Sequence, residues 1–203
     1  MRGMKSLLLA MFVALLMVGC GEADLSDPEV LKDVTADAVD KSKLQDRSGV
    51  TYLPNTQEPF SGYAKRAYEN GQIKELAQFK NGYIVRIKEW SENGTPKMEV
   101  TLKDGELHGL ETLWYKNGQK NTEVNYKDGK MDGLALKWCE NGQKGMEVNW
   151  KDGKLISAEV WKPNGEKCPV TNVKDGNGVL VWYNEDGRET GRLTLKDGEE
   201  VED

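Results

Sequence analysis

Few residues in this chain have the types and spacing that chemistry requires. Its one histidine, His108, stands in a repeated position that Asp132 occupies in another unit, so a polar role beside a turn fits it better than acid–base catalysis. The histidine and cysteines lack zinc-ligand spacing. The Asp-Gly pairs lack the alternating carboxylates of a calcium-binding loop, and turn formation accounts for them. The sequence therefore predicts no catalytic centre, metal or cofactor, and it favours binding over enzymatic activity.

Two repeated sets of side chains remain as candidates for a binding surface. Tryptophans in successive repeats either pack as a ladder between strands or offer stacking platforms for sugar rings, and packing is the favoured reading. Lysines that precede the second turn of each repeat are either solvated edge charges, the favoured reading, or contacts for an anionic partner. The candidate surface consists of Trp90, Trp114, Trp138, Trp161, Trp182, Lys103, Lys127 and Lys151.

The elements that position these residues are marked by two series of turn dipeptides. The first series starts at Asn70-Gly71 and the second at Asn81-Gly82; each recurs about every 23 residues, and the two glycines of a unit are always 11 residues apart. Asn-Gly and Asp-Gly pairs between alternating apolar residues are a strong hairpin signal, because both central residues need φ > 0. A fixed period of this kind predicts a repeat architecture in which each unit packs only on its neighbours.

These patterns predict an all-β fold, an antiparallel meander of about a dozen strands in a single twisted, elongated sheet. Residues 69–203 are assigned to six hairpin repeats and residues 49–68 to a degenerate leading hairpin unit. Residues 20–48 form an acidic tether with a possible short helix that starts at Asp27-Pro28. Cys139 and Cys168 are expected about three strand steps apart, roughly 14 Å, which predicts two unpaired thiols.

The second strand of the middle repeats contains an irregularity. Its apolar face changes sides around Gly109 and Gly133, as a β-bulge at a glycine would require. Units with another residue at that position are expected to bend less or differently: Arg86, Ser157 and Leu180.

The start of the chain carries a targeting signal. Basic Arg2 and Lys5 precede an apolar run over residues 7–18, which is too short to cross a bilayer as a helix but suits an export signal over residues 1–19. Residues 16–20, Leu-Met-Val-Gly-Cys, resemble the lipobox of bacterial lipoproteins. The resemblance implies that Cys20 is lipidated and anchors the chain to a membrane of the bacterial cell envelope, the outer membrane in a Gram-negative cell.

The net charge of −6 without a basic stripe excludes nucleic acid as an expected partner. The motifs over residues 103–109 and 127–133, with those over 59–62 and 68–71, resemble MORN repeats of the bacterial subtype found in proteins labelled YwqK-type antitoxins. That resemblance implies a β-hairpin surface for membrane or protein contact, and the label implies neutralisation of a toxin. We therefore expect a membrane-anchored lipoprotein that binds an unknown protein as a scaffold or immunity protein. The alternative is an envelope glycan-binding module that uses the tryptophan column.

Overall fold

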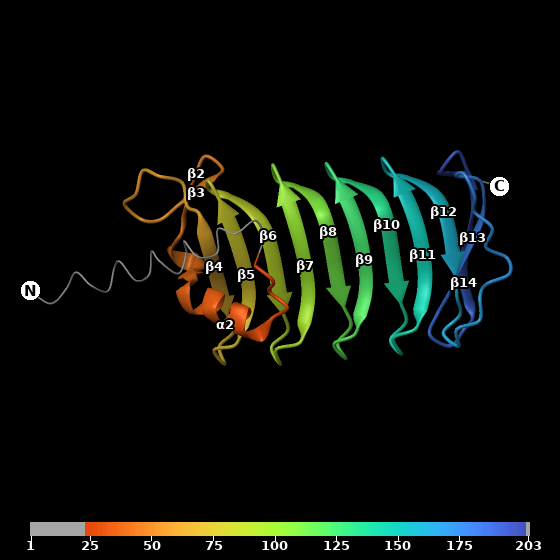
Figure 1. The fold of residues 1–203 in the computed structure, drawn as a ribbon, viewed down its shortest axis with the longest axis horizontal. Helices are drawn as coiled ribbons and strands as arrows, with labels where there is room; N and C mark the ends of the chain where they lie inside the picture. The colour runs from red at the N-terminus through yellow and green to blue at the C-terminus, as the bar shows by residue number, and fades with distance from the viewer. Residues whose placement is uncertain (1–22, 202–203) are drawn as a thin grey trace, which may run out of the picture. The chain divides into compact units, whose positions relative to one another are not determined.

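The computed structural model describes residues 23–201 (Figure 1). The chain divides into two compact units, residues 1–38 and 39–203. In the first unit, helix α2 (Pro28–Asp37) begins where the sequence predicts, because the Asp27 carboxylate accepts hydrogen bonds from the backbone N–H groups of Glu29 and Val30. The predicted export signal and Cys20 lie outside the described residues. Among those described, no helix is both long and apolar enough to cross a membrane.

The second unit is built around a long sheet of ten strands. Nine of them follow one another as an antiparallel meander, and the short β1 (Val39–Asp40) pairs in parallel with the first. The alternating residues and turn dipeptides thus form the all-β repeat meander that the sequence predicts. The nine strands are β4 (Gly62–Ala67), β5 (Ile73–Lys80), β6 (Tyr83–Trp90), β7 (Pro96–Lys103), β8 (Glu106–Trp114), β9 (Lys120–Lys127), β10 (Lys130–Trp138), β11 (Lys144–Lys151) and β12 (Lys154–Val160).

The predicted single sheet does not continue to the C-terminus. Strands β13 (Gly178–Tyr183), β14 (Glu189–Lys196) and β15 (Glu199–Val201) form a separate three-stranded sheet. The segment over residues 161–177 contains Pro163 and Pro169, which have no N–H group to continue a ladder. It instead follows the edge of β12, where the N–H of Cys168 donates to the carbonyl of Val160. The fifth repeat therefore ends the first sheet.

The leading region also differs from the expected hairpin over residues 49–68. Strand β3 (Val50–Tyr52) pairs with β2 (Gln45–Arg47), while β4 pairs with β5. The turn between β2 and β3 is Ser48-Gly49, and both residues have positive φ angles, 57° and 84°. Regular strands thus begin inside the segment that was assigned to the tether, because a Ser-Gly pair takes the role that Asn-Gly or Asp-Gly has elsewhere.

The two series of turns have different conformations. Both residues of each second-series turn have positive φ, as in Asp104 and Gly105 at 53° and 84°, which confirms the prediction. In the first series only the glycine has positive φ, so the same prediction is wrong there. In that series the Asn70 side chain accepts a hydrogen bond from the backbone N–H of Gln72 at 2.9 Å. This bond stabilises the turn without a positive φ at the asparagine.

The predicted bulges are present at the two glycines. Between β7 and β8, residues 108–110 lie opposite Thr101 alone, and Gly109 has a φ of 95°. The same irregularity recurs between β9 and β10 around Gly133. Units without this glycine show a register shift of one residue or none, at Arg86, Ser157 and Leu180.

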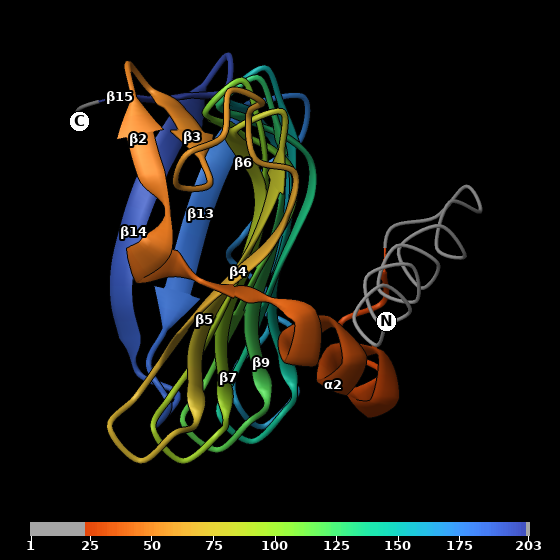
Figure 2. The ribbon, with the colours of Figure 1, turned by 90° about the vertical axis from the view of Figure 1, so that its left-hand side faces the viewer.

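The sheet is curved, as Figure 2 shows. One apolar cluster lies on its inner side at each end. At the end nearest β4, residues before and after β3 cover the sheet. At the other end β13 and β14 cover β11 and β12. The first cluster contains Phe60, Ala64, Ala77 and Phe79. The second, which we call the C-terminal cluster, contains Val148, Leu155, Ala158, Val160, Cys168, Val173, Leu180, Val181 and Leu195.

Candidate functional site

Four of the five predicted tryptophans form a row along the outer face of the meander. Residues that pair directly across neighbouring strands share a face. Successive residues of a strand point to opposite faces, and Trp90, Trp114, Trp138 and Trp161 each follow a residue of the inner face, so they lie on the face opposite the two apolar clusters. Trp182 is not part of the row, because it belongs to β13 in the second sheet and packs against the C-terminal cluster.

Lysine ammonium groups occupy the indole faces of this row. Lys120 Nζ lies 5.9 Å from the Trp138 ring centre, and Lys144 Nζ lies 5.2 Å from that of Trp161. Each lysine also pairs with a glutamate three residues along its own strand, Glu123 or Glu147. The cation–π contact and the ion pair together fix the lysine over the ring. The row is therefore a packed Lys–Trp–Glu ladder.

The predicted lysines lie on the opposite long edge of the sheet from the tryptophans. Lys103, Lys127 and Lys151 end β7, β9 and β11 beside the second-series turns, and all three are exposed. A strand of eight residues spans about 27 Å, so the two candidate sets do not form one site. Lys151 Nζ donates to Asp132 at 2.9 Å, and this hydrogen bond lowers the pKa of the Asp132 carboxyl.

The inner face contains one continuous row of directly paired residues, one from each strand of the meander. Eight of its members are alanine, isoleucine or valine, and the ninth is Glu111 at the centre of the row, on β8. The row runs Ala64, Ala77, Ile87, Val100, Glu111, Val124, Ala135, Val148 and Ala158.

The middle of this face belongs to neither apolar cluster. We call it the central inner surface and define it by residues of β7, β8 and β9 that the two clusters leave out. All are half-buried except Val100, which is buried. They are Met98, Val100, Leu102, Leu107, Glu111, Leu113, Val124 and Tyr126.

Glu111 has one described side-chain partner on this surface. The Tyr126 hydroxyl donates to its carboxylate at 3.3 Å. Burial, and then the charge of Glu111, raise the pKa of the Tyr126 hydroxyl, because both disfavour tyrosinate. A carboxylate can accept about four hydrogen bonds, so one long bond leaves most of its capacity for water or for a bound cation.

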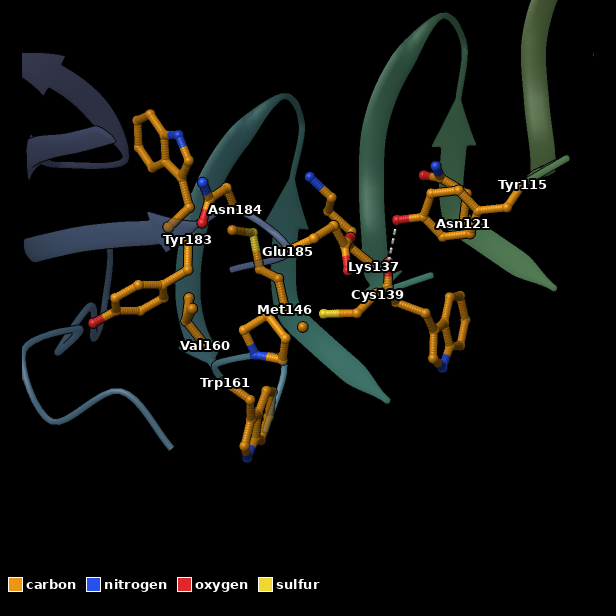
Figure 3. A pocket seen from close by; sticks show the side chains of 14 residues that line it. Tyr115, Asn121, Lys137, Cys139, Met146, Val160, Trp161, Tyr183, Asn184 and Glu185 are labelled. Carbon is orange, nitrogen blue, oxygen red and sulfur yellow. Dashed lines mark hydrogen bonds between the residues drawn. The ribbon is translucent and has the colours of Figure 1, made fainter. Parts of the chain in front are cut away.

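A pocket of about 360 Å³ lies near the first-series turns, at the ends of β10, β12 and β13 (Figure 3). The Tyr115 hydroxyl donates to the carbonyl of Trp138 at 2.7 Å, and burial followed by the charge of Glu185 raises the pKa of Tyr115 to about 12. Figure 3 shows the rings of Tyr115, Trp161 and Tyr183 pointing in different directions. The pocket is therefore no aromatic cage around a single point.

The remaining chemically active groups have structural partners. His108 Nδ1 lies 3.2 Å from an Asp128 carboxylate oxygen at the neighbouring turn. Cys139 and Cys168 are buried free thiols, as their predicted separation requires, and the Cys168 sulfur lies 3.1 Å from the Tyr183 hydroxyl. In residues 23–201 no three His, Cys, Asp or Glu side chains are placed to hold a metal ion.

Two features of the site differ from the sequence-based expectations, although the sequence contains signals for both. The lysines that cover the tryptophans follow the first-series turn in a repeated Asn-Gly-Gln-Lys motif, at Lys120 and Lys144. Glu111 stands where the other units of the meander have Ile87, Ala135 and Ala158, so a position-by-position comparison of the units finds it.

Comparison with known proteins identifies the repeat unit. A search of curated proteins gave no match. A family described as MORN repeat variant matches the chain at residues 61–81 and 107–128. Each match spans two strands of the meander and the first-series turn between them, β4–β5 in one case and β8–β9 in the other. The chain therefore contains two recognisable MORN-variant repeats, and the second of them includes Glu111 and the β8 and β9 residues of the central inner surface.

Proposed function

We propose that this protein is a membrane-anchored lipoprotein that uses its repeat sheet to bind another protein, as a scaffold or in an immunity role like that of an antitoxin. MORN repeats often mediate protein or membrane binding, which supports a binding role. The observation that carries the proposal is the central inner surface, where three strands of an apolar face have neither end cluster on them. When a partner removes apolar area of this kind from water, the free energy of the system falls, which favours binding.

We place this function above enzymatic activity and above glycan binding. His108 is engaged with Asp128 beside a turn, and no second catalytic group accompanies it in the described pairings. Sugar stacking would require free indole faces, whereas Lys120 and Lys144 lie over the rings of Trp138 and Trp161. The glycan alternative would be revived by indole fluorescence that responds to added envelope glycan.

The anchor and the binding function can be tested together in cells. Metabolic labelling with an alkyne fatty acid should mark the wild-type chain, and Cys20→Ser should abolish the label and release the chain from the membrane fraction. Chemical crosslinking in intact cells, followed by affinity purification, should recover one specific protein with both chains. A labelled Cys20→Ser chain would contradict the anchor. Recovery of no protein above background from either chain would contradict the binding function.

A further inference from the structure

The central inner surface combines an apolar strip with one carboxylate at its middle. Val100 and Val124 pair directly with Glu111 on either side, and Leu113 and Leu107 flank it on its own strand. A carboxylate among apolar side chains costs free energy when a partner displaces its water, unless the partner supplies a cation or hydrogen-bond donors. The surface therefore favours a partner that brings a positive charge to this point and apolar groups around it.

The dimensions of the surface limit the shape of that partner. The strands on either side of it, β6 and β10, are four strand steps apart, or about 19 Å. An α-helix with its side chains is about 10–12 Å wide, so one helix fits along the strands between the two apolar clusters. The strands are eight or nine residues long, about 27 Å, which matches a helix of about 18 residues.

An extended peptide or a second copy of the chain fits less well. The face of a sheet offers no free backbone N–H or C=O groups, since the ladders between β7, β8 and β9 use them, so an added strand gains no hydrogen bonds there. A second sheet would pack about 10 Å above the first. At both ends of the meander that layer is already filled by residues of the two apolar clusters, such as Phe60 and Leu195.

We infer that the central inner surface binds an amphipathic helix of another protein, whose apolar side carries a lysine or arginine that pairs with Glu111. This inference rests on the proposed protein-binding function and specifies its face and its partner's chemistry. Tyr126 belongs to the same site, because its hydroxyl donates a hydrogen bond to the Glu111 carboxylate at 3.3 Å. Glu111 selects the partner through charge, while Leu107 and Leu113 supply apolar contact.

Site-specific photocrosslinking of the full chain in its native cells tests this inference. A photoreactive phenylalanine replaces Leu107 or Leu113 on the inner face. As a matched control it replaces Leu134, an exposed residue on the outer face with 38% of its surface accessible to solvent. We expect positions 107 and 113 to capture a different protein through an amphipathic segment that contains lysine or arginine, and position 134 to capture none. Glu111→Gln should lower the yield about tenfold at low salt, and Glu111→Arg should be rescued by a lysine- or arginine-to-glutamate change in the captured segment.

The outcomes separate this inference from the proposed function. Capture of another protein at position 134 alone, or capture of a segment of another protein that has no cation, would overturn the inference and leave the proposed function intact. Capture of a second copy of the chain and of no other protein would contradict both. A yield unchanged by Glu111→Gln, in a variant with an unaltered unfolding midpoint, would overturn it as well. Capture at none of the three positions would contradict both the inference and the proposed function.

Discussion

The ends of the meander and its middle share one pattern of alternating residues but differ in what lies on the inner face. At the C-terminal end, Val148 and Ala158 pack in one cluster with Val181 and Leu195 of the second sheet. In the middle, Val100 and Val124 flank a glutamate, and neither cluster includes them. Units of similar sequence thus serve two purposes. The ends close the hydrophobic core, and the middle keeps an apolar strip with a charge in it.

The largest expected effect comes from a comparison of one leucine from each region. Leu195→Ala removes a buried side chain from the C-terminal cluster and should cost about 2–5 kcal/mol of unfolding free energy, including the cavity it leaves. Leu113→Ala, on the half-buried central inner surface, should cost only about 1 kcal/mol. Denaturant unfolding measures both. Equal losses of unfolding free energy in the two variants would show that the middle of the inner face is packed as tightly as its ends, and would contradict the difference between these regions.

A second test asks whether the glycine bulges shape the middle of the sheet. A Cβ atom at Gly109 would meet Thr101 Oγ1 at 2.5 Å, and a residue with a side chain would have to adopt a backbone φ of +95° there. Gly109→Ala should therefore lower stability by about 2 kcal/mol, and Gly105→Ala, at positive φ with open space around it, by about 1 kcal/mol. Adding Thr101→Ala should recover part of the Gly109→Ala loss. No recovery would mean that steric contact is not the cause.

A third test weighs the outer face against the inner one. Lys120→Ala removes the cation above Trp138 and the ion pair with Glu123, but the lysine is exposed, so the loss should be about 0.5 kcal/mol. The expected change is therefore smaller than that of either leucine variant. A loss of several kcal/mol in the same unfolding assay would make the outer ladder, and not the inner clusters, the main source of stability.

The smallest expected effect concerns pH at the second-series turns. The hydrogen bond from Lys151 lowers the folded-state pKa of Asp132, so this group adds stability above its unfolded-state pKa and loses it as the pH falls through the folded value. Asp132→Asn should lower the unfolding midpoint slightly at pH 7 and leave it unchanged below the folded-state pKa. A difference that persists undiminished in strong acid would exclude this ion pair as its source.

The sequence predicts the repeated part of the fold well, because local turn chemistry determines it. Dipeptides such as Asp104-Gly105 specify the hairpins, and Gly109 specifies the bulge that follows. The sequence does not predict the separate C-terminal sheet, because the path of residues 161–177 depends on tertiary contacts, such as the hydrogen bond from the Cys168 N–H to the Val160 carbonyl. Local signals do not encode such contacts.

The candidate site was predicted less well than the fold. Repetition in the sequence points to the tryptophans and the edge lysines, yet the structure separates Trp114 from Lys103 by the length of a strand and places lysines over the indoles of Trp138 and Trp161. The informative residue, Glu111, is the one that departs from its repeat. Its significance depends on which strands stay outside the end clusters, and that is a property of the packed molecule.

The unfolding free energy of Glu111→Val distinguishes a binding role of Glu111 from a structural one. If Glu111 is kept for binding and not for folding, valine should complete the apolar row and raise stability by about 1 kcal/mol, despite the lost contact with Tyr126. Val124→Glu, the matched change on the paired position, should lower it by about 1–3 kcal/mol. A Glu111→Val chain that is less stable than the wild type by 1 kcal/mol or more would make Glu111 a structural residue and contradict the central claim.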